Sequence, residues 1–140
     1  MLELKVKAQM ENLYLVQDKL EVWLNENKCS MKTIMQINIA AEEVFANIVH
    51  YAYDSLAGDV IIKCEIIERD FEKVISISFL DSGRKYNPLE NKEPDINLSS
   101  EEREIGGLGI LMVKRIMDNV DYYYRDNFNV LTIQKNIDIN

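Results

Sequence analysis

Hydrophobic and polar residues alternate at the start of the chain, where Leu2, Leu4 and Val6 are separated by charged side chains. An alternation with a period of two is typical of a β-strand that buries one face. Two pairs of β-rich runs occur later, VIIKCEIIE and KVISISFL around the polar residues RDFE, and VDYYY and NVLTIQK around RDNF. Runs joined by a few polar residues favour hairpins. The sequence therefore predicts one N-terminal strand and, further along, two β-hairpins.

A helical period of about 3.6 residues replaces the alternation in three further stretches, 10–25, 32–53 and 109–118. The second stretch carries the longest apolar stripe, which consists of Ile34, Ile37, Ala41, Val44, Phe45, Ile48 and Ala52. We therefore expect three helices, of which the second is the longest.

The order of these elements is β-α-α-β-β-α-β-β. A polar stretch from 89 to 104 contains Pro94 and is expected to form a long loop. Strands joined as hairpins, with helices between them, are typical of the α+β class. We expect a two-layer sandwich in which helices cover one face of a mixed, mostly antiparallel sheet. A chain of 140 residues can bury a core of its own, which predicts a single domain over residues 1–140.

Charge and composition narrow the classes of ligand. The formal net charge is -8 and the pI is about 4.7, which argues against a nucleic-acid or anionic-membrane surface, because both require basic residues. A nucleotide is not excluded, since a metal ion and a few donors can neutralise its phosphates. We see no secretion signal and no apolar run near the roughly 18 residues of a membrane span. Cys29 and Cys64 match no metal-ligand spacing, and a buried free thiol at Cys64 fits a cytoplasmic location.

The first stretch that suggests chemistry is AAEEVFANIVHYAY, within the second helix. Glu43 and Asn47 are four residues apart and share one helix face, roughly opposite the apolar stripe. A solvated face is the ordinary interpretation of such a pair. The neighbouring Ile39 and Tyr51 instead favour the wall of a cleft that carries one carboxylate and one carboxamide. His50, the only histidine, is interpreted as structural.

The second stretch, FLDSGRKYNP, places Asp81 directly after a predicted strand, where a loop can lift its side chain out of the sheet. A carboxylate accepts hydrogen bonds in two directions. Gly83 permits a backbone geometry, or a close approach of a ligand, that a Cβ atom would prevent. An ordinary Asp-Ser-Gly turn is the alternative interpretation.

The third stretch, EIGGLGILMVK, contains three of the five glycines, Gly106, Gly107 and Gly109, before a predicted helix. It matches neither a dinucleotide-binding fingerprint nor a Walker A loop, because Met112 and Ile110 stand where those motifs require glycine and lysine. A helix stop does not fit either, because the preceding segment is polar and irregular. What remains is a glycine-rich approach to a helix N-terminus, where free N–H groups and the helix dipole favour an anion such as phosphate.

Taken in this order, the three stretches resemble the motifs of the gyrase, chaperone, histidine kinase and mismatch-repair ATPase superfamily. EEVFANIVHYAY, DSGRKYNP and GGLGILMVKRIMDNVDY, followed by NVLTIQK, are similar in detail to the short anti-sigma-factor serine/threonine kinases. The resemblance covers about residues 1–135 and implies the Bergerat-type ATP-binding fold. DSGRKY lacks the second glycine found in many superfamily members, and the short kinases lack it too, which supports the subfamily.

The resemblance implies roles for individual residues. Glu43 is expected to be the general base that aligns or deprotonates the attacking hydroxyl, and Asn47 to hold Mg²⁺ against the phosphates of ATP. Asp81 is expected to recognise the adenine amino group, and Gly83 to let the loop approach the base.

The same resemblance makes the glycine-rich stretch part of a lid over the triphosphate. Gly107 and Gly109 are expected to line the phosphates with backbone donors, and Gly106 to give the lid its hinge. Because the chain is acidic overall, the lid must supply cationic help, and Arg103 is the candidate.

The function implied is an ATP- and Mg²⁺-dependent serine/threonine protein kinase. It would phosphorylate a small anti-anti-sigma antagonist protein and regulate a sigma factor by binding it. Two alternatives stay open: a non-catalytic ATP-binding module that acts by protein contact, and a free-standing ATPase. Glu43 favours the kinase and the ATPase, since a binding module needs no base. A homodimer through the first strand and helix is a further expectation from the relatives.

Overall fold

The computed structural model describes residues 1–90 and 107–137. Its strands form one five-stranded sheet in the order β1-β2-β3-β5-β4, and all four neighbouring pairs are antiparallel. The strands are β1 (Leu2–Lys7), β2 (Asp59–Arg69), β3 (Glu72–Asp81), β4 (Asn119–Arg125) and β5 (Phe128–Ile137). The β2–β3 and β4–β5 pairs are the two predicted hairpins, and the β3–β5 pair joins them into one sheet.

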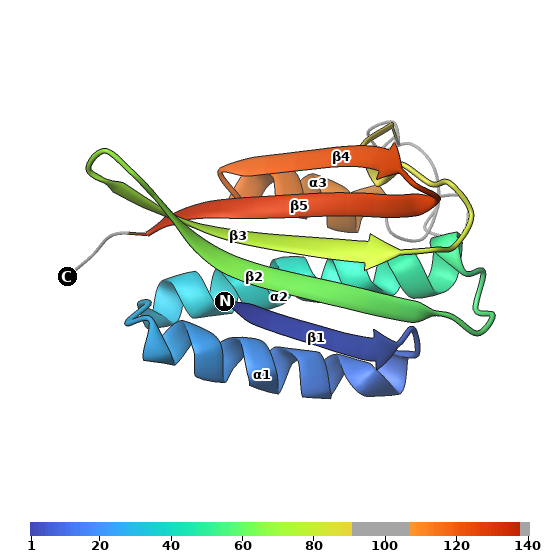
Figure 1. The fold of residues 1–140 in the computed structure, drawn as a ribbon, viewed down its shortest axis with the longest axis horizontal. Coiled ribbons are helices and arrows are strands. Elements are labelled where there is room, and N and C mark those ends of the chain that lie inside the picture. The colour runs from blue at the N-terminus through green and yellow to red at the C-terminus, as the bar shows by residue number, and fades with distance from the viewer. Residues whose placement is uncertain (91–106, 138–140) are drawn as a thin grey trace.

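The helices lie on one face of this sheet, with α2 and α3 behind the strands and α1 below β1 in Figure 1. The helices are α1 (Leu13–Glu26), α2 (Met31–Asn47) and α3 (Gly107–Ile116), and the shorter turns are η1 (Met10–Asn12), η2 (Ile48–Ala52) and η3 (Pro88–Glu90). The architecture is the α+β two-layer sandwich that the sequence predicts, but the sheet of the described residues is antiparallel throughout and not mixed. The predicted loop 89–104 starts within η3, and its residues from 91 onward lie outside the described residues.

The boundaries of α2 matter for the site, because both Glu43 and Asn47 lie on it. The helix starts after Ser30, whose Oγ accepts a hydrogen bond from the N–H of Thr33 at 3.2 Å and so satisfies one of the free donors of the first turn. The helix predicted to reach Tyr53 is α-helical only to Asn47, after which the chain forms the π-helical turn η2. Such turns are frequent at functional sites.

A single hydrophobic cluster fills the space between the sheet and the helices. Its fully buried members include Ile37 and Phe45 from α2, and Ile77 and Phe79 from β3. Cys64 belongs to it as a free thiol, as predicted, and burial raises the pKa of this thiol to about 12. No helix within the described ranges is long and apolar enough to cross a membrane.

Tyr53 links the start of β2 to the segment that follows β3. Its hydroxyl donates to the carbonyl oxygen of Asp59 at 2.6 Å and accepts from the N–H of Ser82 at 2.8 Å. The ring lies so close to Gly58 that a Cβ atom at this position would overlap it. The missing side chain at Gly58 therefore lets Tyr53 anchor the loop after Asp81.

We expect Gly58→Ala to lower the free energy of unfolding by about 1–3 kcal/mol, the usual effect of overpacking a filled site. Urea denaturation followed by circular dichroism measures this difference. The neighbouring exposed position supplies the control, Ala57→Ser, which should stay within about 0.5 kcal/mol of the parent chain. Equal stability of Gly58→Ala and the parent would show that Tyr53 is not held as described.

Candidate nucleotide-binding site

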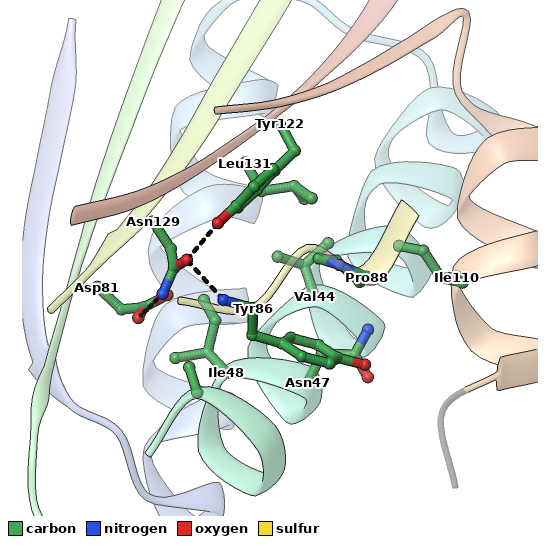
Figure 2. Close-up of a pocket in the computed structure, with 11 residues that line it drawn as sticks. Val44, Asn47, Ile48, Asp81, Tyr86, Pro88, Ile110, Tyr122, Asn129 and Leu131 are labelled. Atoms are coloured by element: carbon green, nitrogen blue, oxygen red, sulfur yellow. Dashed lines mark hydrogen bonds between the residues drawn. The ribbon is translucent and has the colours of Figure 1, made fainter. Parts of the chain in front are cut away.

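A pocket opens at the end of the sheet where β3 ends, between α2 with its η2 extension and the loop after β3 (Figure 2). It holds about 330 Å³ of space between atoms, part of which is open to solvent. Its walls are mainly apolar, and its polar groups are few. The lining residues are Val44, Asn47, Ile48, Ala52, Asp81, Tyr86, Pro88, Ile110, Tyr122, Asn129 and Leu131. The structure therefore brings Asn47 and Asp81, two of the residues expected to bind ATP, into one pocket.

Asp81 is the last residue of β3 and is only 2% exposed. Its Oδ1 accepts hydrogen bonds from Nδ2 of Asn129 at 2.8 Å and from the N–H of Gly83 at 3.0 Å. Burial raises the pKa of this carboxyl above its ordinary value, and these two hydrogen bonds oppose the rise. Within the described part of the chain, no donor reaches Oδ2 of Asp81. The carboxylate thus keeps one oxygen for a ligand.

Asn47 is the last residue of α2 and is 4% exposed. Its Nδ2 is buried and has no hydrogen-bond partner among the described residues. An unpaired buried amide is unfavourable by about 1–3 kcal/mol unless a ligand completes its hydrogen bonds. The ordinary interpretation of this helix face was exposure to solvent. It does not apply to Asn47, whose side chain is buried in the pocket wall.

Glu43 lies one turn before Asn47 on α2 and is half-buried. Its carboxylate meets the first turn of α3, where a Cβ atom on Gly109 would overlap Oε2 of Glu43. Burial raises the pKa of Glu43, and the neighbouring charge of Glu42 raises it further. The lack of a side chain at Gly109 is thus what allows α3 to approach the expected catalytic carboxylate.

Gly83 follows Asp81 and packs on the backbone of η2. A Cβ atom on Gly83 would overlap the carbonyl group of Ala52. The next residue, Arg84, donates its N–H to the same carbonyl oxygen at 2.9 Å and its Nε to the carbonyl oxygen of Tyr51 at 2.7 Å. The close neighbour of Gly83 in the structure is the backbone of η2, and the expected approach of this loop to a ligand stays a prediction.

Three residues of the pocket with polar side-chain atoms were not singled out from the sequence: Tyr86, Tyr122 and Asn129. The Tyr86 ring stacks on Tyr51 with centroids 5.1 Å apart. A signal for Asn129 existed, because the alternation in NVLTIQK places it on the same strand face as the buried Leu131. A polar residue on the core face needs partners. Tyr86 lay in a loop with no periodicity, so the sequence held no comparable signal for it.

The other expected residues are only partly described. Arg103 and Gly106 lie outside the described residues, and Gly107 is the first residue of α3. His50 is exposed on η2 and does not line the pocket. The phosphate end of the predicted site is therefore represented by Gly109 and the start of α3.

The family of the chain follows from comparison with known proteins. The model of the histidine kinase-like ATPase domain matches residues 6–135, and the chain belongs to this family. The chain is similar to the serine-protein kinase RsbW of Bacillus cereus, with 25% identity over 135 residues that cover 93% of this chain and 81% of the relative. It is also similar to the serine/threonine-protein kinase BtrW of Bordetella bronchiseptica, with 24% identity over 107 residues that cover 76% of this chain and 73% of the relative.

The fold has a counterpart among solved structures. A chain in the crystal structure of the SiaB-SiaC complex from Pseudomonas aeruginosa matches with a TM-score of 0.53 and 18% identity, covering 98% of this chain and 90% of that chain. Together with the family match and the curated kinases, this confirms the resemblance drawn from the three sequence stretches.

The raised pKa of Asp81 leads to a prediction for the free protein. A carboxyl with a raised pKa binds more protons in the folded than in the unfolded state, so the free energy of unfolding falls as pH rises through the interval between the ordinary and the raised pKa. Asp81→Asn removes the buried charge and should raise the melting temperature near neutral pH. The gain should shrink as the pH falls through that interval and should be lost below the ordinary pKa of aspartate.

Thermal unfolding by circular dichroism at about pH 4 and about pH 7.5 tests this sign. Asp18→Asn, at an exposed position on α1, is the matched control and should change little between the two conditions. A melting temperature that drops in Asp81→Asn at neutral pH would contradict a net unfavourable burial of the Asp81 charge.

Proposed function

We propose that this chain is an ATP-dependent serine/threonine protein kinase of the anti-sigma type. It phosphorylates a small anti-anti-sigma antagonist protein, and it regulates a sigma factor by binding to it. Both activities take place in the cytoplasm. The observation that carries the proposal is the pocket between α2 and β3, in which a buried carboxylate with one spare oxygen and a buried amide without a partner face the same space. The kinase names of the relatives RsbW and BtrW support the reaction class.

The polar and apolar groups at the base end of this pocket suit the chemistry of adenine. The exocyclic amino group of adenine donates hydrogen bonds, and Oδ2 of Asp81 is an acceptor with no donor among the described residues. Val44, Ile48 and Leu131 line the same pocket with apolar groups, which suit the faces of a planar base. A guanine would present a carbonyl oxygen to the carboxylate, so the site should discriminate against it.

The residues also fit a magnesium ion that comes with the nucleotide. In the described ranges no cluster of three or more His, Cys, Asp or Glu residues could hold a metal ion. Mg²⁺ commonly takes one or two protein ligands, substrate phosphates and water, and the side-chain oxygen of Asn47 is suited to such a site. When bound, Mg²⁺ neutralises phosphate charge.

Glu43 supplies the chemistry that the protein itself must provide. Its carboxylate accepts the proton of the acceptor serine hydroxyl while the serine oxygen bonds to the γ-phosphorus and the bond from phosphorus to the departing ADP oxygen breaks. Burial raises the pKa of Glu43, which brings this pKa nearer to neutral pH, where a general base works best. Gly109 lets the first turn of α3 stand against the same carboxylate, where its N–H groups can receive phosphate oxygens.

Nucleotide selectivity tests the role of Asp81. The parent chain should bind ATP in the presence of Mg²⁺, bind it more weakly in EDTA, and prefer ATP to GTP in calorimetry. In Asp81→Asn, the amide oxygen should take the two hydrogen bonds from Asn129 and Gly83, leaving an NH₂ group towards the base. ATP affinity should therefore fall by about 10- to 150-fold, the equivalent of about 1.5–3 kcal/mol for a charged hydrogen bond, while GTP affinity falls less. Equal affinity of the parent for ATP and GTP would contradict the adenine role.

Phosphoryl transfer tests Glu43. Glu43→Gln keeps the shape of the side chain and removes the base, so ATP affinity should stay near that of the parent while transfer to the partner falls by roughly 10²- to 10⁴-fold. Radiolabel transfer from ATP to a serine of the partner measures the rate. The partner is obtained by affinity capture from native lysate with and without ATP, followed by mass spectrometry.

Glu42→Gln is the matched control, because Glu42 is the neighbouring exposed carboxylate on the same helix. It removes only the smaller of the two causes of the raised Glu43 pKa, the charge of Glu42, and keeps the base, so it should transfer phosphate within a few-fold of the parent rate. Transfer by Glu43→Gln at the parent rate would overturn the proposed mechanism. If the parent never transfers phosphate but ATP changes its affinity for the partner, the chain is a binding module, and if it hydrolyses ATP without an acceptor protein, it is a free-standing ATPase.

A further inference from the structure

Asn129, near the start of β5, has every hydrogen-bonding position of its carboxamide occupied. Nδ2 donates to Oδ1 of Asp81 and to the carbonyl oxygen of Arg84, both at 2.8 Å. Oδ1 accepts from the N–H of Tyr86 at 3.0 Å and from the hydroxyl of Tyr122 at 2.5 Å. Figure 2 shows this side chain between Asp81, Tyr86 and Tyr122.

The orientation of the carboxamide is fixed by two backbone groups. The Tyr86 N–H can only donate and the Arg84 carbonyl can only accept, so the oxygen of Asn129 must face Tyr86 and its NH₂ must face Arg84. The second hydrogen of the NH₂ then points to Asp81. An exchange of the oxygen and nitrogen positions would set donor against donor and acceptor against acceptor. The orientation of the Asn129 carboxamide therefore forces its NH₂ group to donate to Asp81.

We infer that Asn129 is a positioning residue that sets the nucleotide selectivity of the pocket by holding Oδ1 of Asp81 and leaving Oδ2 as the acceptor for the base. This inference rests on the function proposed above. The hydrogen bonds from Asn129 and Gly83 both end on the same carboxylate oxygen. A proton on Asp81 would accordingly sit on Oδ2 and turn the acceptor into a donor. The donor from Asn129 favours the ionised form and so preserves the preference for an amino group.

The same side chain also shapes the wall of the pocket. By binding Arg84 and Tyr86 it fixes the loop after β3, and Tyr86 in turn stacks on Tyr51 of η2. Asp81 and the aromatic wall therefore take their positions from one residue of β5. A substitution at Asn129 should therefore alter the preference for ATP over GTP and not only the free energy of unfolding.

The test compares Asn129→Ala with Val130→Ala. Val130 is the next residue on β5, is buried, and does not line the pocket. Two quantities are measured for each folded variant: the ratio of ATP to GTP affinity by calorimetry, and the pH midpoint of the Asp81 carboxyl carbon by NMR. Among the described residues, Tyr122 donates a titratable hydroxyl to this network, and burial raises the pKa of that hydroxyl above its ordinary value, so it stays neutral during the Asp81 titration.

Asn129→Ala should lower the ATP to GTP ratio by about tenfold, as for loss of a charged hydrogen bond, and move the Asp81 midpoint to higher pH. Val130→Ala should leave both quantities at parent values. If Asn129→Ala does not fold, Tyr122→Phe removes one hydrogen bond from Asn129 and should shift both quantities in the same directions by less. The inference is overturned if the folded Asn129→Ala variant keeps the parent values of the ATP to GTP ratio and of the Asp81 midpoint. Where Asn129→Ala does not fold, the same result for Tyr122→Phe overturns it.

A parent chain that binds no ATP would instead overturn the proposed function. In that case the Asp81 titration still decides whether Asn129 controls the carboxyl. The positioning role is supported if the Asp81 midpoint rises in Asn129→Ala, or in Tyr122→Phe where that variant takes its place, and does not rise in Val130→Ala. Equal midpoints in all variants contradict the positioning role.

Discussion

The burial of one carboxylate, that of Asp81, is the constraint on which the site depends. A buried charge is unfavourable unless donors surround it, and here the donors come from two separate segments, the β5 strand through Asn129 and the loop through Gly83. Both act on the same oxygen, and burial still raises the pKa of the carboxyl. The folded protein therefore holds a charge that is incompletely compensated, and a ligand with a hydrogen-bond donor would complete it. This makes the base end of the pocket a source of affinity and, in the free protein, of instability.

Helix α2 carries the second half of the site on the face that its core stripe leaves free. Its apolar side chains, such as Ile37 and Phe45, are fully buried against the core. The positions of Glu43 and Asn47, one turn apart, then follow from the helical repeat. The change to a π-helical turn directly after Asn47 brings the carbonyl groups of η2 to the loop that follows Asp81. The packing of the core thus fixes the position of Glu43, the expected base, relative to the pocket that holds Asp81.

Much of this could be predicted from the sequence, because the information was local. The alternation with a period of two predicted the strands, and the period of about 3.6 residues predicted the helices. The turn RDNF contains Asp126 and Asn127, and both adopt the positive φ that a tight hairpin requires. The order β3-β5-β4 is different, since it depends on pairing between strands about 50 residues apart, such as Asp81 with Asn129. The π-helical turn was also hidden, because a pattern of apolar residues is nearly the same for an α-helix and for one turn with an extra residue.

The glycines show most clearly where local information ends. The sequence predicted that Gly83 lets the loop approach a ligand and that Gly109 lines the phosphates, whereas the contacts that the structure shows for both glycines are with other parts of the chain. Gly83 meets the carbonyl group of Ala52, and Gly109 meets the carboxylate of Glu43. The second contact bears on the proposed function, because it places the start of α3 directly against Glu43, the residue proposed as the base. Any ligand that shifts α3 must then also shift the surroundings of Glu43, so under the proposed function phosphate binding at α3 would change the environment of the proposed base through a single missing side chain.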